Sequence, residues 1–117
     1  MREGTRKVLS LARQLVAHGW TQGAEVDAKA SGVGKAYSTV GAIRTACDVY
    51  GYKTKAKRGG NSDRFINGAF KTLAGQVKGS RRLVDGTGAT VLAAWNDDAG
   101  RSKADVLATF DAVLGRW

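Results

Sequence analysis

The sequence predicts a mainly α-helical fold, with about five short helices in one compact domain spanning residues 1–117. Apolar residues recur at spacings of three and four along most of the chain, as in amphipathic helices. Proline is missing from the 117 residues whereas glycine occurs 16 times, so glycines and polar caps must mark the helix ends. A hydrophobic content of 43% and a length typical of one domain favour a folded globule.

The first two helices are predicted over residues 5–18 and 38–50. Thr5 can cap the first helix, and Gly19 stands where a left-handed C-cap belongs. Residues 20–36 contain three glycines and no helical period, which predicts a loop or a short β-hairpin. Ser38 can cap the second helix, and one apolar face is expected to contain Val40, Ile43, Cys47 and Tyr50.

Residues 51–60 alternate between lysines and other residues. A period of two permits an edge strand over residues 51–58, and the Gly59-Gly60 pair is equally consistent with a mobile arm. A third helix is predicted over residues 62–78, with Asn61 and Ser62 as candidate caps. Its apolar face comprises Ile66, Ala69, Phe70, Leu73 and Val77.

The C-terminal part of the chain predicts two more helices. A short one over about residues 88–95 contains Val91, Leu92 and Trp95. The last helix follows Ser102, which together with Asp105 resembles a capping box that has Asp in place of Glu. The buried stripe of that helix is expected to comprise Val106, Leu107, Phe110, Val113 and Leu114.

Positive charge is concentrated in residues 53–82, called the basic segment below. Nine basic residues and the single acid Asp63 give this segment +8 of the formal net charge of +9. Such a local excess attracts an anionic partner, whereas evenly spread lysines mostly aid solubility. The candidate polyanion-binding residues are Lys53, Lys55, Lys57, Arg58, Arg64, Lys71, Lys78, Arg81 and Arg82.

Three of these cations share one side of the predicted third helix. Arg64, Lys71 and Lys78 are spaced by seven residues, which nearly repeats the helical direction, and Gly68 and Gly75 fall among them. Each interior glycine costs about 1 kcal/mol relative to alanine. The functional interpretation is that bare backbone lets a phosphate chain approach the cations. The alternative is an ordinary solvated face of an amphipathic helix.

The candidate motifs for an enzyme, a cofactor or a metal each lack a required residue. Gly32-Val33-Gly34-Lys35 departs from a phosphate-binding loop because Ala36 replaces the required Ser or Thr. The single histidine, His18, and the single cysteine, Cys47, cannot form a standard zinc site. We therefore expect no enzyme activity, no cofactor and no metal site. One cysteine and no apolar run long enough to span a bilayer predict a cytoplasmic protein without a membrane partner.

Three segments carry a resemblance to a known family. They are Gly19-Trp20-Thr21-Gln22-Gly23-Ala24, Gly41-Ala42-Ile43-Arg44-Thr45-Ala46, and Trp95-Asn96-Asp97-Asp98-Ala99-Gly100-Arg101 leading into Ala104-Asp105-Val106-Leu107. The chain resembles small uncharacterised proteins of actinobacteria and their phages, which combine GWTQG, GALRAA-like and WND..GR..ADVL motifs. The resemblance implies a source but no mechanism. The shared residues Trp20, Gln22, Trp95, Asn96, Asp97 and Arg101 are either architectural or part of a ligand pocket.

Together these observations predict a small non-enzymatic binding protein, encoded by a phage or another mobile element. Its basic segment is expected to contact the phosphates of DNA or RNA. A different class of function is an inhibitor or adaptor that binds an acidic host protein surface. A third is a protein that sequesters a small ligand through the Trp, Asn and Gln residues of the shared motifs.

Overall fold

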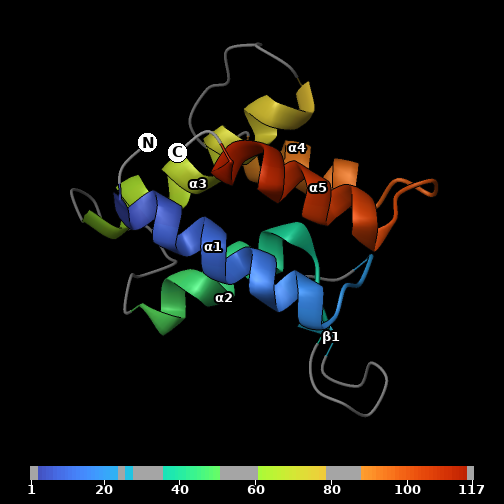
Figure 1. The fold of residues 1–117 in the computed structure, drawn as a ribbon, viewed down its shortest axis with the longest axis horizontal. Coiled ribbons are helices and arrows are strands. Elements are labelled where there is room, and N and C mark those ends of the chain that lie inside the picture. Colours follow the sequence, from blue (N-terminus) through green and yellow to red (C-terminus); the bar gives the residue numbers. More distant parts are fainter. Residues whose placement is uncertain (1–2, 24–25, 28–35, 51–60, 79–87, 116–117) are drawn as a thin grey trace.

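Five helices and one pair of short strands make up the computed structural model, which describes residues 3–23, 26–27, 36–50, 61–78 and 88–115 (Figure 1). The prediction of a mainly α fold with five helices in one compact domain is confirmed. In chain order the elements are α1 (Glu3–His18), β1 (Val26–Asp27), β2 (Ala36–Tyr37), α2 (Thr39–Val49), α3 (Asn61–Lys78), α4 (Gly88–Asn96) and α5 (Lys103–Leu114).

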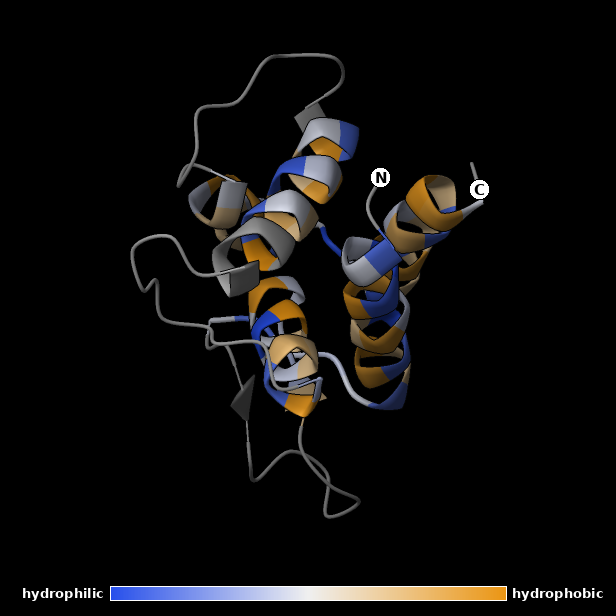
Figure 2. Cartoon of the chain, turned by 90° about the vertical axis from the view of Figure 1, so that its left-hand side faces the viewer, coloured by the Kyte–Doolittle hydropathy of each residue, from blue (hydrophilic) through white to orange (hydrophobic). Residues whose placement is uncertain are grey.

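Helix α1 is central to the packing and contacts α2, α3 and α5, whereas α4 packs mainly on α3 (Figure 1). Hydrophobic and hydrophilic residues lie on different faces of the helices (Figure 2). Burial of the apolar faces supplies the main stabilising free energy. The shared core includes Leu9 and Val16 of α1, Ile43 of α2, Leu73 of α3, Leu92 of α4 and Phe110 of α5.

Two helix starts form as the sequence predicts. The Ser38 side chain accepts a hydrogen bond from the Gly41 backbone N–H at 3.1 Å, which caps α2. At α5, Ser102 Oγ accepts from the Asp105 N–H at 3.2 Å, and Asp105 Oδ2 accepts from the Ser102 N–H at 3.0 Å. The capping box with Asp in place of Glu is therefore confirmed.

Three local predictions are wrong. Thr5 does not cap α1, because the helix begins at Glu3 and Thr5 is buried within it. Gly19 is not a left-handed cap, because Gly23 is the one described glycine with positive φ, at 81°. Tyr50 does not join the buried face of α2; it is the C-cap residue and is 42% exposed.

The region between α1 and α2 contains a minimal β-pairing. Strands β1 and β2 are antiparallel, with Val26 opposite Tyr37 and Asp27 opposite Ala36. Tyr37 also pairs with the segment after α1, since its N–H donates to the Gly19 carbonyl at 2.8 Å. A small hairpin near residues 20–36 was one of the two strand predictions. The other, an edge strand over residues 51–58, lies outside the described residues.

Cys47 is fully buried on α2. Desolvation, with the charge of Asp48 adding to it and Arg44 opposing it, raises the pKa of the thiol to about 12. A thiol with this pKa stays protonated at neutral pH and is a poor nucleophile. The structure therefore agrees with the interpretation of Cys47 as a small buried hydrophobic residue.

The raised pKa of Cys47 predicts how stability depends on pH. In the unfolded chain the thiol ionises near its ordinary pKa of about 8.5, whereas the folded protein keeps the proton until the pH reaches about 12. The unfolded state thus binds fewer protons across this window, so the free energy of unfolding should fall as pH rises above about 8.5. Urea denaturation between these pH values measures the fall. The fall should be smaller in Cys47→Ala than in the wild type. An equal fall in both proteins would contradict its assignment to the raised pKa of Cys47.

Candidate functional site

The side chain of Asn96 joins three segments of the chain at the C-terminal end of α4. It is fully buried. Its Oδ1 accepts hydrogen bonds from Trp20 Nε1 at 2.8 Å, from the Thr39 backbone N–H at 3.0 Å and from Thr39 Oγ1 at 2.8 Å. One amide oxygen thereby connects the residues after α1, the start of α2 and the end of α4.

Hydrogen bonds from neighbouring residues extend this connection. Asn96 Nδ2 donates to the Thr21 carbonyl at 3.1 Å and to Asp97 Oδ1 at 3.1 Å. Asp97 Oδ1 also accepts from the Gly23 N–H at 2.9 Å. Gln22 Nε2 donates to the carbonyls of Asn96 and Asp98, both at 2.9 Å. We call this set the Asn96 clasp; its members are Trp20, Thr21, Gln22, Gly23, Thr39, Asn96, Asp97 and Asp98.

Arg101 fixes the link between α4 and α5. Its Nε donates to the Trp95 carbonyl at 2.9 Å, and its guanidinium carbon lies 4.2 Å from the centroid of the Trp95 ring. Its Nη2 is 3.7 Å from Asp98 Oδ2. Arg101 thus combines a cation–π contact, a hydrogen bond and an ion pair within one short connection.

The structure therefore joins four residues of the shared motifs, Trp20, Gln22, Asn96 and Asp97, by hydrogen bonds, and the other two, Trp95 and Arg101, contact each other. Sequence reasoning missed Thr39, which contributes two of the bonds to Asn96. The signal for it was weak: a polar residue directly after the Ser38 cap, in an otherwise apolar stretch. The donors of Trp20 and Asn96 are used inside the protein, so a ligand could reach these groups only by displacing intramolecular bonds. This geometry favours an architectural role for the motifs over a ligand pocket built from them.

The basic segment is described only where it coincides with α3. Lys71 is exposed on this helix, and Ile66, Ala69 and Leu73 are buried against the core. Arg64 and Lys78 belong to α3 by their backbone. The remaining candidates lie outside the described residues: Lys53, Lys55, Lys57, Arg58, Arg81 and Arg82.

The two glycines of the predicted bare stripe occupy different environments. A Cβ atom at Gly68 would lie 3.0 Å from Thr5 Oγ1, so this glycine permits close packing of α3 against α1. The expectation that Gly68 is sterically open is wrong. Gly75, in contrast, is sterically open as expected, since nothing lies within 4 Å of the position that a Cβ atom would occupy.

Several carboxylates outside the basic segment already have intramolecular partners. Asp111 accepts from Arg13, with the Nη2 and Oδ2 atoms 3.2 Å apart. Asp105 belongs to the capping box of α5, and Asp97 and Asp98 accept hydrogen bonds at the clasp and at Gly100. These four carboxylates thus have partners within the described part of the chain.

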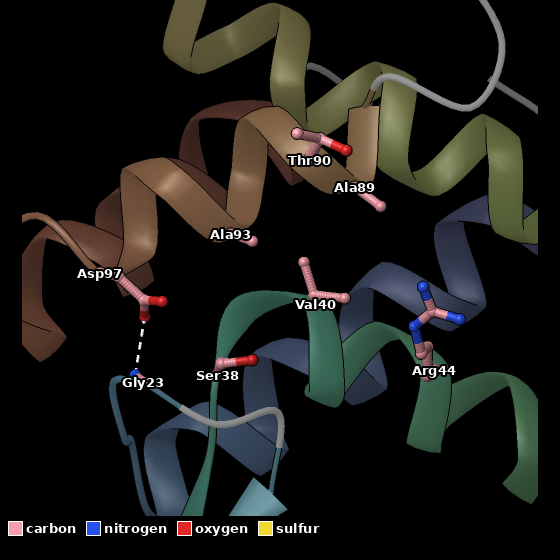
Figure 3. Close-up of a pocket in the computed structure, with 8 residues that line it drawn as sticks. All are labelled: Gly23, Ser38, Val40, Arg44, Ala89, Thr90, Ala93 and Asp97. Carbon is pink, nitrogen blue, oxygen red and sulfur yellow. Dashed lines mark hydrogen bonds between the residues drawn. The ribbon is translucent and has the colours of Figure 1, made fainter.

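Two cavities flank α4 within the part of the chain that the structure describes. One, of about 300 Å³, lies between α2 and α4 (Figure 3). The other, of about 330 Å³, is bordered by Trp95, Arg101 and Val77 on the other side of the helix. Among the residues described, no group of three or more His, Cys, Asp and Glu side chains could hold a metal ion. None of the described helices has both the length and the hydropathy needed to cross a bilayer.

The fold and the site define a small helical domain in which hydrogen bonds of the buried Asn96 connect the segment after α1 to the end of α4. The chain belongs to the DUF6197 family, a family of unknown function, whose model matches residues 1–116. Membership of an uncharacterised family agrees with the resemblance seen in the sequence. Neither the curated proteins nor the solved structures provide a match.

Proposed function

We propose that this protein is a non-enzymatic binding protein whose basic segment contacts the phosphates of a nucleic acid. One observation carries the proposal: residues 53–82 hold +8 of the net charge of +9. A protein that neutralises phosphates with Lys and Arg releases condensed counterions, and this release drives association without any reading of bases.

The placement of α3 supports this proposal. The helix buries its apolar residues in the core and leaves Lys71 exposed. From Arg64 to Lys78 it extends about 21 Å at 1.5 Å per residue, a length comparable to about six phosphates of one strand at 3.4 Å each. Asp111 pairs with Arg13, and Asp105 belongs to the capping box of α5. Both acids therefore have partners outside the basic segment.

Salt dependence gives the quantitative prediction. Electrophoretic mobility shift of a mixed-sequence DNA duplex across a salt series should show the affinity falling steeply as salt rises. The double variant Lys71→Ala/Lys78→Ala should reduce the log–log slope by about two, roughly one counterion for each lost contact. Arg6→Ala/Lys7→Ala is the matched control, because it removes two exposed cations of α1, outside the basic segment, and should leave the slope unchanged.

Two results would refute nucleic-acid binding through this segment. One is no shift of either duplex or single-stranded DNA or RNA at 50 mM salt. The other is an equal loss of slope in the α1 control, which would indicate a response to net charge alone. If a pull-down from nuclease-treated lysate instead retains one acidic protein, the basic segment serves a protein partner and the proposal fails.

A further inference from the structure

The cavity between α2 and α4 has an apolar middle and charged ends. Val40, Ala89 and Ala93 contribute small aliphatic groups to its lining, and Ser38 and Thr90 contribute hydroxyl groups. Figure 3 shows Asp97 at one end and Arg44 at the other, with the aliphatic groups between them. Its volume of about 300 Å³ is at the lower end of the range for small-molecule sites.

The acidic end of the cavity is held in place by the Asn96 clasp. Asp97 Oδ1 accepts from the Gly23 N–H at 2.9 Å and from Asn96 Nδ2 at 3.1 Å. Within the described residues, the hydrogen bonds of this carboxylate all involve Oδ1, so Oδ2 is left to accept from a ligand. Asp97 directly follows α4 and is exposed, so a cation can reach it.

The basic end is the guanidinium of Arg44. Its central carbon lies 5.5 Å from the centroid of the Phe70 ring, which positions the group against α3. A guanidinium has five N–H donors. It can therefore keep its intramolecular contacts and still bind a carboxylate, often through two parallel hydrogen bonds.

Three of the lining residues form a row along α4. Ala89 and Ala93 lie four residues apart on one face of the helix, and Asp97 follows four residues later, just past its end, so the row extends over about 12 Å. Arg44 of α2 lies near the Ala89 end of this row, opposite Asp97 (Figure 3). A ligand that reaches both ends must therefore be elongated, with an uncharged stretch in its middle.

We infer that this cavity binds a small linear zwitterion, with an amine at Asp97 and a carboxylate at Arg44. A short methylene chain would lie over Val40, Ala89 and Ala93. A ligand with only one charged end makes only one of these two charged contacts, which is the basis for selectivity. This site is separate from the basic segment, so it does not depend on the proposed function.

Titration with 6-aminohexanoate tests the inference, followed by the backbone amide signals of Ala89 and Ala93 in NMR spectra. For a ligand of this size we expect a dissociation constant on the order of 1 mM. Hexanoate and pentylamine lack one charge each and should bind at least tenfold more weakly. Asp97→Asn keeps an oxygen that can accept from Gly23 and Asn96 but removes the charge, and it should weaken binding of the zwitterion at least tenfold.

A pair of substitutions at exposed positions locates the site without touching a charge. Ala93→Leu fills the cavity and should abolish binding. Ala94→Leu is the matched control, because Ala94 is also exposed on α4 but borders the cavity on the other side. The inference is overturned if the Ala89 and Ala93 signals do not move at about ten times the expected dissociation constant. It is also overturned if hexanoate binds as tightly as the zwitterion, or if Ala93→Leu binds like the wild type.

Discussion

Replacing Asn96 with alanine should lower the free energy of unfolding by about 3–4 kcal/mol. Its Oδ1 is the acceptor for Trp20 Nε1, for the Thr39 N–H and for Thr39 Oγ1, and the side chain is 0% exposed. Each buried donor left without a partner costs about 1–3 kcal/mol. Relaxation around the smaller side chain and entry of water will recover part of that cost. The remaining loss is large for a protein whose total stability is about 5–15 kcal/mol.

Urea denaturation of the wild type and of Asn96→Ala measures this loss. Thr90→Ala is the matched control, since Thr90 is exposed on the same helix and its replacement should change stability by no more than about 0.5 kcal/mol. Trp20→Phe removes one donor to Asn96. In a double-mutant cycle it should couple to Asn96→Ala, because the two residues share a hydrogen bond. A loss below about 1 kcal/mol in Asn96→Ala would mean that the clasp is not a main stabilising element.

The helices could be predicted because their signals are local. Apolar periodicity placed α2, α3 and α4 to within a residue or so of their observed bounds, and the caps at Ser38 and Ser102 matched known side-chain patterns. Thr5 was predicted to be a cap from its residue type, whereas the helix begins two residues earlier, at Glu3. Thr5 is instead buried where α1 packs against Gly68 of α3, and that contact has no local signature.

The clasp could be predicted only as a set of residues, not as an arrangement. The sequence marked both Trp20-Thr21-Gln22-Gly23 and Trp95-Asn96-Asp97 as notable. The bonds between these segments join residues 74 to 76 positions apart. Such pairings depend on how the helices pack, and a single sequence gives no periodicity from which to read them. Thr39 escaped notice for the same reason, because its partner lies 57 positions away.

Alanine at Gly88 should destabilise the protein by about 1–3 kcal/mol, the usual effect of overpacking a close contact. Gly88 is the first residue of α4 and is buried. A Cβ atom there would lie 3.0 Å from both the carbonyl carbon and the Cβ of Phe70, and 3.1 Å from the Phe70 carbonyl oxygen. Two of these atoms belong to the backbone of α3, which cannot move aside as a flexible side chain could. The two helices would have to separate, and contacts across their interface would be lost.

Gly75→Ala provides the matched comparison for this prediction. Gly75 lies within α3 with nothing within 4 Å of its Cβ position, so alanine adds no clash and gains about 0.5–1 kcal/mol of helix propensity. The same substitution should therefore lower the melting temperature at residue 88 and raise it at residue 75, by a few degrees per kcal/mol for a domain of this size. Scanning calorimetry of the two variants measures both signs. If Gly88→Ala melts at or above the wild-type temperature, the separation of α3 and α4 is not set by the absence of a side chain at this position.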